Sequence, residues 1–445
     1  MYIRDLICLI LIIFVGFFAR SVNIAVPNEV TFDEIHFGGF INSYINRVYF
    51  FDIHPPLGRL TLYFCAKMAG YKGQIHFGHR EEYKDNIFIT LRQIPTFFGT
   101  GVGVMMFFSL RIIGASTFIS FTGAMMCALD LCLICESKYI LTDGVLHFYA
   151  SLCLLTYVCL YKTKTYTKSW WTWLVLSSIS TGCVISCKHT GLSFIIFGIA
   201  FHIVFCHSIK ELATRFSFLA TLAFLVYYAT FAIHFHILIY DSEDGVLMSN
   251  EFQQTLIDPA NRPVPNNMSL FEKFVELNSL ILTNNMMINP YHPYGSKWYT
   301  WPLMLSRGTM FWGDGKRSVW SIGNPAVWWL ASGGVLFCIV MSFVDRENRP
   351  MLALSVFGWA ASYFPFALIP RSMWNYHYSI PLIISVFCLN YAISVVKLGE
   401  LRGILASSVL ILTVIGYIWL FPMVYGIPVE NSLFINKEWG SVQQK

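Results

Sequence analysis

Long apolar runs separated by polar segments recur along almost the whole chain. A helix that crosses a lipid bilayer needs about 20 mostly apolar residues. The first run has Arg4 before it and no small-residue cleavage site after it, so we expect a membrane anchor and not a removed signal peptide. The pattern predicts about eleven spanning helices, near 5–22, 93–113, 116–135, 143–161, 170–187, 190–207, 216–240, 325–344, 351–369, 376–396 and 403–424.

Composition places the chain in the same class. Hydrophobic residues make up 56% of it and charged residues 12%, whereas ordinary soluble domains carry about 25% charged residues. These charges are too few to cover a soluble surface, so we expect an all-α polytopic membrane protein. The same values exclude collagen, coiled coils and disordered chains. The formal net charge of +5 is small and scattered, and predicts no nucleic acid partner.

The 12 cysteines lie almost entirely in apolar runs. A secreted disulfide framework would place paired cysteines in polar loops. Cys132 and Cys135 have CxxC spacing, but their neighbours are apolar and no second pair accompanies them. A buried thiol packs as a small apolar side chain. We therefore expect packing roles for these cysteines, and no metal or redox site.

The distribution of basic residues predicts the orientation in the membrane. Short cytoplasmic loops carry an excess of Lys and Arg. The odd-numbered short loops hold few, namely Lys138, Lys188 and Arg371. We therefore expect a cytoplasmic N-terminus and, with an odd number of spans, a C-terminus on the other side. The even-numbered short loops carry Lys162, Lys164, Lys168, Lys210, Arg215, Arg346, Arg349, Lys397 and Arg402.

Two polar stretches, 23–92 and 241–324, are too long to be turns, and both fall on the non-cytoplasmic side. Loops of this length in a compact protein are usually functional or disordered. Both are rich in aromatic residues, which favours folded, functional loops. They divide the chain into an N-terminal transmembrane module (1–240), a loop (241–324) and C-terminal helices (325–445). The sequon at Asn267 is a possible glycosylation site.

Asp33 and Glu34 follow the first span in the motif TFDEIHFGGF. On a helix, adjacent side chains point about 100° apart, so one acid could face a cleft while the other orients it. The alternative is a helix N-terminus beside the membrane, where the helix dipole favours acids. The spacing alone does not decide between them.

Further along, FDIHPPLGRL places His54 beside two prolines, between Asp52 and Arg59. The prolines stop a helix and Gly58 permits a tight bend. The segment is either the entry turn of a helix or a rigid loop that folds back toward the bilayer with His54 at its tip.

Ionisable residues at the edges of the predicted spans gather on the non-cytoplasmic side. Such residues are costly in a membrane and indicate function, and Arg and Lys suit phosphate. The sequence has no P-loop and no soluble nucleotide domain, so a phosphate donor would arrive as a lipid phosphate. A nearby carboxylate could deprotonate an acceptor hydroxyl. The group comprises Arg20, Arg92, Glu136, Lys138, Asp143, Lys188, His189, Arg371 and His377.

Specific segments of the chain resemble those of protein O-mannosyltransferases nearly from end to end. This family moves mannose from dolichyl phosphate mannose to Ser or Thr of secretory proteins. The similar segments are ARSVNIAVPNEVTFDEIHFGGF, DIHPPLGRL, LRQIPTFFG, ESKYILTDGVLHFY, HFHILIYDSEDGVLMSNEFQQTL, FEKFVELNSLILTNN, HPYGSKWYTWPL, RGTMFWG and GNPAVWW.

The resemblance implies a GT-C fold, the endoplasmic reticulum membrane, and homo- or heterodimers of related subunits. It implies Asp33 as catalytic base and Glu34 as its partner acid. Donor-phosphate contacts would come from Arg92 above all, with Arg20, Lys138 and Arg371. Dolichyl phosphate mannose is the donor substrate, and neither a cofactor nor a divalent metal is firmly implied. Binding or positioning roles would fall to His54, Asp143, Lys188, His189, His292, Trp301 and His377.

The chain departs from the family in two places. Fungal and animal members carry a β-trefoil MIR domain in the loop before the eighth span, whereas here FQQTLIDP runs almost directly into NMSLFEKF. We therefore expect a short form without that domain, which puts acceptor-peptide recognition in doubt. Lys138 also stands where the family pattern leads us to expect arginine.

Three other functions compete with this interpretation. The first is another GT-C enzyme, such as a GPI-assembly mannosyltransferase or a lipid-A sugar transferase, which the specific motifs disfavour. The second is a transporter, which would show internal repeats. The third is a non-catalytic partner subunit, against which the presence of both Asp33 and Glu34 argues.

Overall fold

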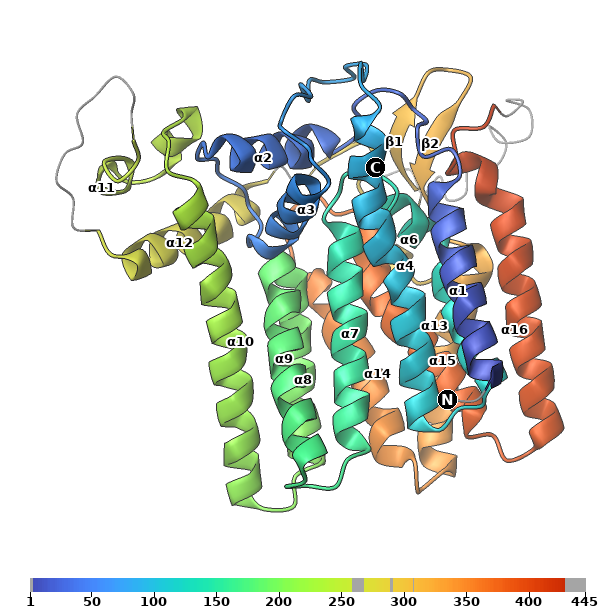
Figure 1. Cartoon of the computed structure of the whole chain (residues 1–445). Helices are drawn as coiled ribbons and strands as arrows, with labels where there is room; N and C mark the ends of the chain where they lie inside the picture. Colours follow the sequence, from blue (N-terminus) through green and yellow to red (C-terminus); the bar gives the residue numbers. More distant parts are fainter. Residues whose placement is uncertain (1–2, 258–267, 289–290, 307, 429–445) are drawn as a thin grey trace.

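The computed structural model describes residues 3–257, 268–288, 291–306 and 308–428. Long helices run side by side as one bundle (Figure 1), and each apolar run predicted above lies in helical structure. The N-terminal half contributes α1 (Ile3–Ser21), α4 (Ile87–Ile113), α5 (Thr117–Ala128), α6 (Leu131–Glu136), α7 (Asp143–Tyr161), α8 (Lys168–Cys187), α9 (Leu192–Val204) and α10 (Ile209–Ile237). The C-terminal half contributes α13 (Pro325–Val344), α14 (Arg349–Tyr363), α15 (Ser379–Ser394) and α16 (Gly399–Leu420).

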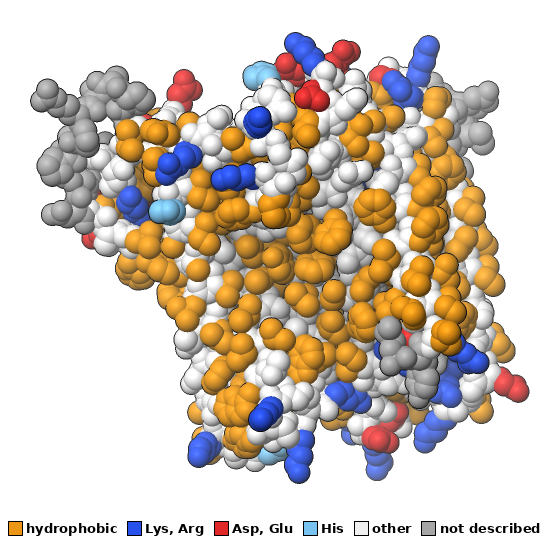
Figure 2. Space-filling view, viewed as in Figure 1, with side chains coloured by type: hydrophobic (Ala, Val, Ile, Leu, Met, Phe, Trp, Pro, Cys, Tyr) orange, Lys and Arg blue, Asp and Glu red, His pale blue; other side chains and the backbone are white. Residues whose placement is uncertain are grey.

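The molecule is a multi-pass membrane protein. Among the described helices, 8 are long and apolar enough to cross a membrane. Figure 2 shows hydrophobic side chains over the middle of the bundle and charged side chains gathered at its two ends. The shorter helices α5 and α9, and α1 with its charged Arg4, Asp5 and Arg20, fall outside the group of 8, so the count of eleven spans stays a prediction.

The third predicted span is broken into α5 and α6 by Asp130. Its carboxylate accepts a hydrogen bond from the backbone N–H of Leu133 at 3.0 Å and so caps the N-terminus of α6. The same carboxylate accepts hydrogen bonds from the Trp328 indole at 2.9 Å and the Asn324 backbone at 3.0 Å. A polar cap inside an apolar run therefore ends one helix and ties the two halves of the bundle together.

The two long loops form a layer over one end of the bundle (Figure 1). The first loop contains α2 (Glu34–Asn46) and α3 (Leu57–Met68). The described part of the second contains α11 (Asn250–Gln253), α12 (Leu270–Met287) and an antiparallel hairpin of β1 (Thr309–Gly313) and β2 (Ser318–Ser321).

Direct contacts join the two loops into one layer. The rings of Phe32 and Phe311 stack at 4.0 Å, and the Ser242 hydroxyl donates to the carbonyl of Tyr49 at 2.6 Å. α1 begins at the far end of the bundle and α16 ends near the loop layer (Figure 1). The loop layer thus covers one end of the bundle, where several of the bundle helices begin or end.

Candidate active site

The candidate site lies where the loop layer meets the bundle, and helix ends place its charged groups. Asp33 precedes the first residue of α2, Asp143 is the first residue of α7, and Lys188 follows the last residue of α8. Polar side chains at helix ends escape the apolar middle of a membrane bundle. Three segments far apart in the sequence thus bring acids and a cation together.

Glu34 is fully buried, and its carboxylate is fully used by the protein. It accepts hydrogen bonds from Arg92 through Nε and Nη2, both at 2.7 Å. The Tyr83 hydroxyl and the backbone N–H groups of Thr31 and Ile140 donate to it as well, each at 3.0 Å. Such a carboxylate joins the first loop to α4 and to the segment after α6, and has no place for a substrate proton.

Arg92 is equally enclosed. Besides Glu34, its guanidinium donates to the backbone carbonyls of Ile24, Pro27 and Glu29 at 2.8–3.2 Å. It also lies 4.9–5.3 Å from the ring centroids of Tyr83, Phe88 and Tyr139. The expectation that Arg92 contacts the donor phosphate disagrees with this geometry, because every N–H group of the side chain is already used.

Arg20 and Lys138 also serve the protein interior. Arg20 donates to Ser137 Oγ at 2.8 Å and to the carbonyls of Ala128 and Cys127 at 3.2 and 3.4 Å, where its charge suits the C-terminus of α5. Lys138 donates to the carbonyl of Val22 at 2.6 Å, and burial lowers the pKa of its ammonium group to about 7. Neither side chain is placed to bind phosphate.

Asp33 stands in contrast to these residues. Its side chain is half-buried, and its carboxylate makes no hydrogen bond or ion pair with any residue that the structure describes. Burial raises the pKa of this carboxyl group above its usual range; the charge of Asp143 adds to the effect, while His36, Lys188 and His54 oppose it. A poorly solvated carboxylate without a protein partner is suited to accept a proton.

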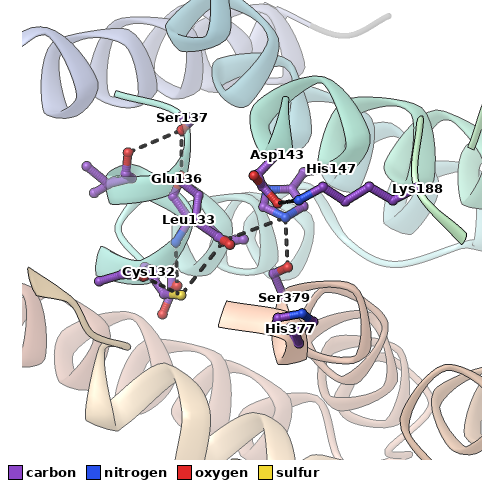
Figure 3. Close-up of polar contacts among 12 residues, drawn as sticks. Cys132, Leu133, Glu136, Ser137, Asp143, His147, Lys188, His377 and Ser379 are labelled. Atoms are coloured by element: carbon purple, nitrogen blue, oxygen red, sulfur yellow. Dashed lines mark hydrogen bonds and ion pairs between the residues drawn. The ribbon is translucent and has the colours of Figure 1, made fainter. Parts of the chain in front are cut away.

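Asp143 and Lys188 form an ion pair, with Nζ 2.6 Å from Oδ1 (Figure 3). Although burial opposes it, the Asp143 charge raises the pKa of Lys188 above its usual value, so the ammonium group stays charged. The pair therefore places an ammonium group and a neutralising carboxylate within electrostatic reach of Asp33, where they act on it in opposite directions.

His54 belongs to a second polar group, on the approach to α3. Its Nδ1 lies 3.1 Å from Oδ1 of Asp52, and the Arg59 guanidinium lies 2.5 Å from Oδ2 of the same carboxylate. Burial opposes ionisation of Asp52, but Arg59 and His54 bring the pKa of this carboxyl group well below its usual range. The DIHPPLGR motif thus forms a rigid turn that orients the half-exposed His54 ring.

Arg371 differs from the other predicted phosphate ligands in its hydrogen bonding. It is half-buried, makes no hydrogen bond or ion pair with a described residue, and burial lowers its pKa. Tyr376 lies within electrostatic reach of both Arg371 and Asp33, and its ring packs edge-on against Phe32 at 6.2 Å. Tyr376 therefore interacts electrostatically with both groups, which the sequence did not indicate.

The other predicted residues are more scattered. The ring centroid of His377 lies 5.7 Å from that of Trp374 and 6.2 Å from that of Trp301, and both pairs are stacked. Trp301 is fully buried, so it packs against His377 from the protein interior. His189 Nε2 lies 3.4 Å from the Tyr227 hydroxyl. His292 is exposed in the second loop, and Asn267 lies outside the described residues.

Sequence reasoning also missed His147, one helical turn after Asp143 on α7. Its Nε2 lies 2.7 Å from Ser379 Oγ and 3.6 Å from Oε2 of Glu136 (Figure 3). The i, i+4 spacing of Asp143 and His147 was the available signal, because it places both side chains on one helix face.

Comparison with known proteins identifies the family of the chain. Residues 10–239 match the family model described as dolichyl-phosphate-mannose-protein mannosyltransferase. Residues 270–442 match the C-terminal four TMM region of protein-O-mannosyltransferase. The chain belongs to this family.

Fungal mannosyltransferases are among the curated proteins that the chain resembles. Dolichyl-phosphate-mannose–protein mannosyltransferase 4 of Candida albicans is 29% identical over 57% of this chain and 36% of its own length. Mannosyltransferase 6 of Saccharomyces cerevisiae is 30% identical over 65% of this chain and 40% of its own length. The alignments thus span about two-fifths of these relatives.

Solved structures confirm the GT-C fold. A chain of the Saccharomyces cerevisiae protein O-mannosyltransferase Pmt1–Pmt2 complex bound to the sugar donor superposes with a TM-score of 0.88, at 17% identity, over 99% of this chain and 93% of that one. ArnT of Cupriavidus metallidurans bound to undecaprenyl phosphate gives a TM-score of 0.56 at 13% identity, over 94% of this chain and 76% of that one.

Proposed function

We propose that this chain transfers mannose from dolichyl phosphate mannose to Ser and Thr hydroxyls of secretory-pathway proteins. The transfer inverts the anomeric configuration and takes place on the luminal face of the endoplasmic reticulum membrane, with the N-terminus cytoplasmic and the C-terminus luminal. Family membership gives the class of reaction. The unpartnered carboxylate of Asp33, beside the Asp143–Lys188 ion pair, is the observation that carries the proposal.

Asp33 acts as the general base. An acceptor hydroxyl is a weak nucleophile at neutral pH, and a carboxylate within hydrogen-bond reach can take its proton during attack. The hydroxyl oxygen bonds to the anomeric carbon of mannose while the bond from that carbon to the phosphate oxygen breaks. The proton ends on Asp33, and dolichyl phosphate leaves with the electron pair.

Arg371 binds the donor phosphate. The leaving phosphate gains negative charge as the glycosidic bond breaks, and a guanidinium group is matched to phosphate oxygens. Unlike Arg20, Arg92 and Lys138, Arg371 keeps its N–H groups free of protein acceptors in the described residues. Lys188 adds positive charge nearby while it stays paired with Asp143.

Glu34 and Arg92 hold this site together without touching substrate. Their bidentate pair fixes the loop that carries Asp33 against α4. The similar Saccharomyces cerevisiae chain forms a complex of Pmt1 with Pmt2, and we propose a dimer with a related subunit here. Another GT-C transferase and a non-catalytic subunit are the competing functions.

Direct assay of the full chain distinguishes these functions. Membranes that carry it are incubated with radiolabelled dolichyl phosphate mannose and a Ser/Thr peptide. The expected product is peptide-linked mannose whose anomeric configuration is opposite to that of the donor. A matched peptide with Ala at every Ser and Thr should remain unlabelled. Membranes with abundant folded chain, alone and with related subunits, that give no peptide labelling would contradict the proposal.

A further inference from the structure

Glu136, Asp143 and His147 bring three metal-binding side chains together next to the candidate active site. One ligand atom from each lies within 4.8 Å of the others, and all three residues are buried. Asp143 and His147 are one turn apart on α7, and Glu136 is the last residue of α6. Figure 3 shows the Glu136 carboxylate directed at His147, and Asp143 paired with Lys188.

The described residues do not satisfy the hydrogen-bonding capacity of the Glu136 carboxylate. Its side chain is 1% exposed, and Oε1 has no hydrogen-bond partner. Oε2 has only weak contacts, with Cys132 Sγ at 3.8 Å and His147 Nε2 at 3.6 Å. A buried carboxylate left in this way is costly unless a cation or a proton completes its surroundings.

The two acids of the cluster differ in whether a basic side chain neutralises them. Lys188 neutralises Asp143 through the 2.6 Å ion pair, whereas Glu136 has no ion pair with Lys or Arg in the described part of the chain. The Ser379 hydroxyl, 2.7 Å from His147 Nε2, adds a neutral oxygen at the same point. Two carboxylates and one imidazole are a donor set suited to divalent first-row metals such as Mn²⁺ and Zn²⁺.

We propose that Glu136, Asp143 and His147 bind a divalent transition-metal ion. The ion coordinates the Glu136 oxygen that has no hydrogen-bond partner. It also fixes the position of Asp143, and through the ion pair that of Lys188, near Asp33. His147 Nε2 lies 3.6 Å from Oε2 of Glu136 and 2.7 Å from the Ser379 hydroxyl. This inference does not depend on the sugar that the chain transfers, because it concerns binding of the metal alone.

Metal titration of the purified full chain in detergent tests the site. The protein is stripped with a chelator and titrated with Mn²⁺, and free Mn²⁺ is followed by its electron paramagnetic resonance signal. One Mn²⁺ per chain is expected. Glu136→Gln and His147→Phe should each weaken binding by at least about 100-fold, since even loss of an outer-shell partner costs about 10- to 100-fold.

His202→Phe is the matched control. His202, like His147, is a fully buried histidine, but its two ring nitrogens have no hydrogen-bond partner among the described residues and it lies on α9, away from the cluster. This variant should bind Mn²⁺ like the unaltered chain. Elution volume and thermal unfolding establish that each variant is folded, and the two ligand variants test the site independently.

Two results overturn the proposal. One is an unaltered chain that binds neither Mn²⁺ nor Zn²⁺ saturably up to millimolar concentration, with Zn²⁺ measured by mass spectrometry of the desalted protein. The other is equal binding by the unaltered chain and both folded ligand variants. In either case Glu136 would hold a proton in place of a metal. Mannosyl transfer is not part of the readout, so this failure is distinct from failure of the proposed function.

Discussion

Asp33 and Glu34 are consecutive residues whose carboxylates have opposite surroundings. Glu34 is fully buried and receives two 2.7 Å hydrogen bonds from Arg92. Asp33 is half-buried and receives none from the described residues. The α2 helix begins between them, so the turn of the backbone directs one acid into the protein and leaves the other at the site.

Glu34→Gln should destabilise the protein strongly. It leaves the Arg92 guanidinium buried without a counter-charge, and breaking a buried ion pair from one side costs about 3–5 kcal/mol. Thermal unfolding in detergent measures the effect as a lowered Tm.

Asp33→Asn is the matched control for that measurement. The raised pKa of Asp33 means that folding disfavours its charged form, so a neutral amide should leave the Tm unchanged or slightly higher at neutral pH. Equal losses of Tm for Glu34→Gln and Asp33→Asn would contradict the structural role of Glu34.

Arg371→Met should impair use of the lipid donor. Loss of a charge-assisted contact to the leaving phosphate costs about 2–4 kcal/mol in the transition state, roughly 30- to 1,000-fold in kcat/KM for dolichyl phosphate mannose. The KM for the acceptor peptide should change little. Arg317→Met is the control, since this arginine is exposed on the hairpin and paired with Asp314. Unchanged donor kinetics in Arg371→Met would assign the phosphate to another cation.

As the pH is lowered, the rate of mannosyl transfer should begin to fall at a pH above the pKa of an ordinary aspartate. The base must be deprotonated, and burial together with Asp143 raises the pKa of Asp33. Lys188 lowers it, so Lys188→Met should move the acid limb of the kcat/KM profile to higher pH. A limb that stays in place or moves to lower pH would show that another group controls it.

Tags on the two termini should be protected differently in sealed microsomes. Basic residues cluster in the loops at the end of the bundle where α1 begins (Figure 1), and such loops face the cytoplasm. Added protease should remove an N-terminal tag and spare a C-terminal one until detergent opens the vesicles. Equal access to both tags would contradict the proposed orientation.

The fold followed from the sequence because the membrane imposes a simple rule. Each long apolar run became helical, since backbone groups in lipid must be satisfied within the helix. Asp130 shows where this reasoning stops. One acid within a run of 20 residues leaves the run apolar, yet its capping hydrogen bond ends the helix.

The sequence predicted which residues belong to the site, but not which residues they bond to. Sequence alone shows that Arg20, Arg92 and Lys138 stand at membrane edges, not that backbone carbonyls and Glu34 use their N–H groups. Such pairings join residues tens of positions apart. Tyr376 was missed because a tyrosine in an aromatic-rich segment carries no signal until the fold brings it within electrostatic reach of Arg371 and Asp33.

Mannosyl transfer by Asp33→Asn, compared with the unaltered chain at equal membrane content, tests the proposed catalytic role most directly. Asparagine keeps the shape of aspartate but cannot take the proton of the acceptor hydroxyl. The variant should insert and bind donor normally, and its turnover should fall by at least about 100-fold, the contribution expected of a general base. Near-normal transfer by folded Asp33→Asn would contradict the assignment of Asp33 as the base.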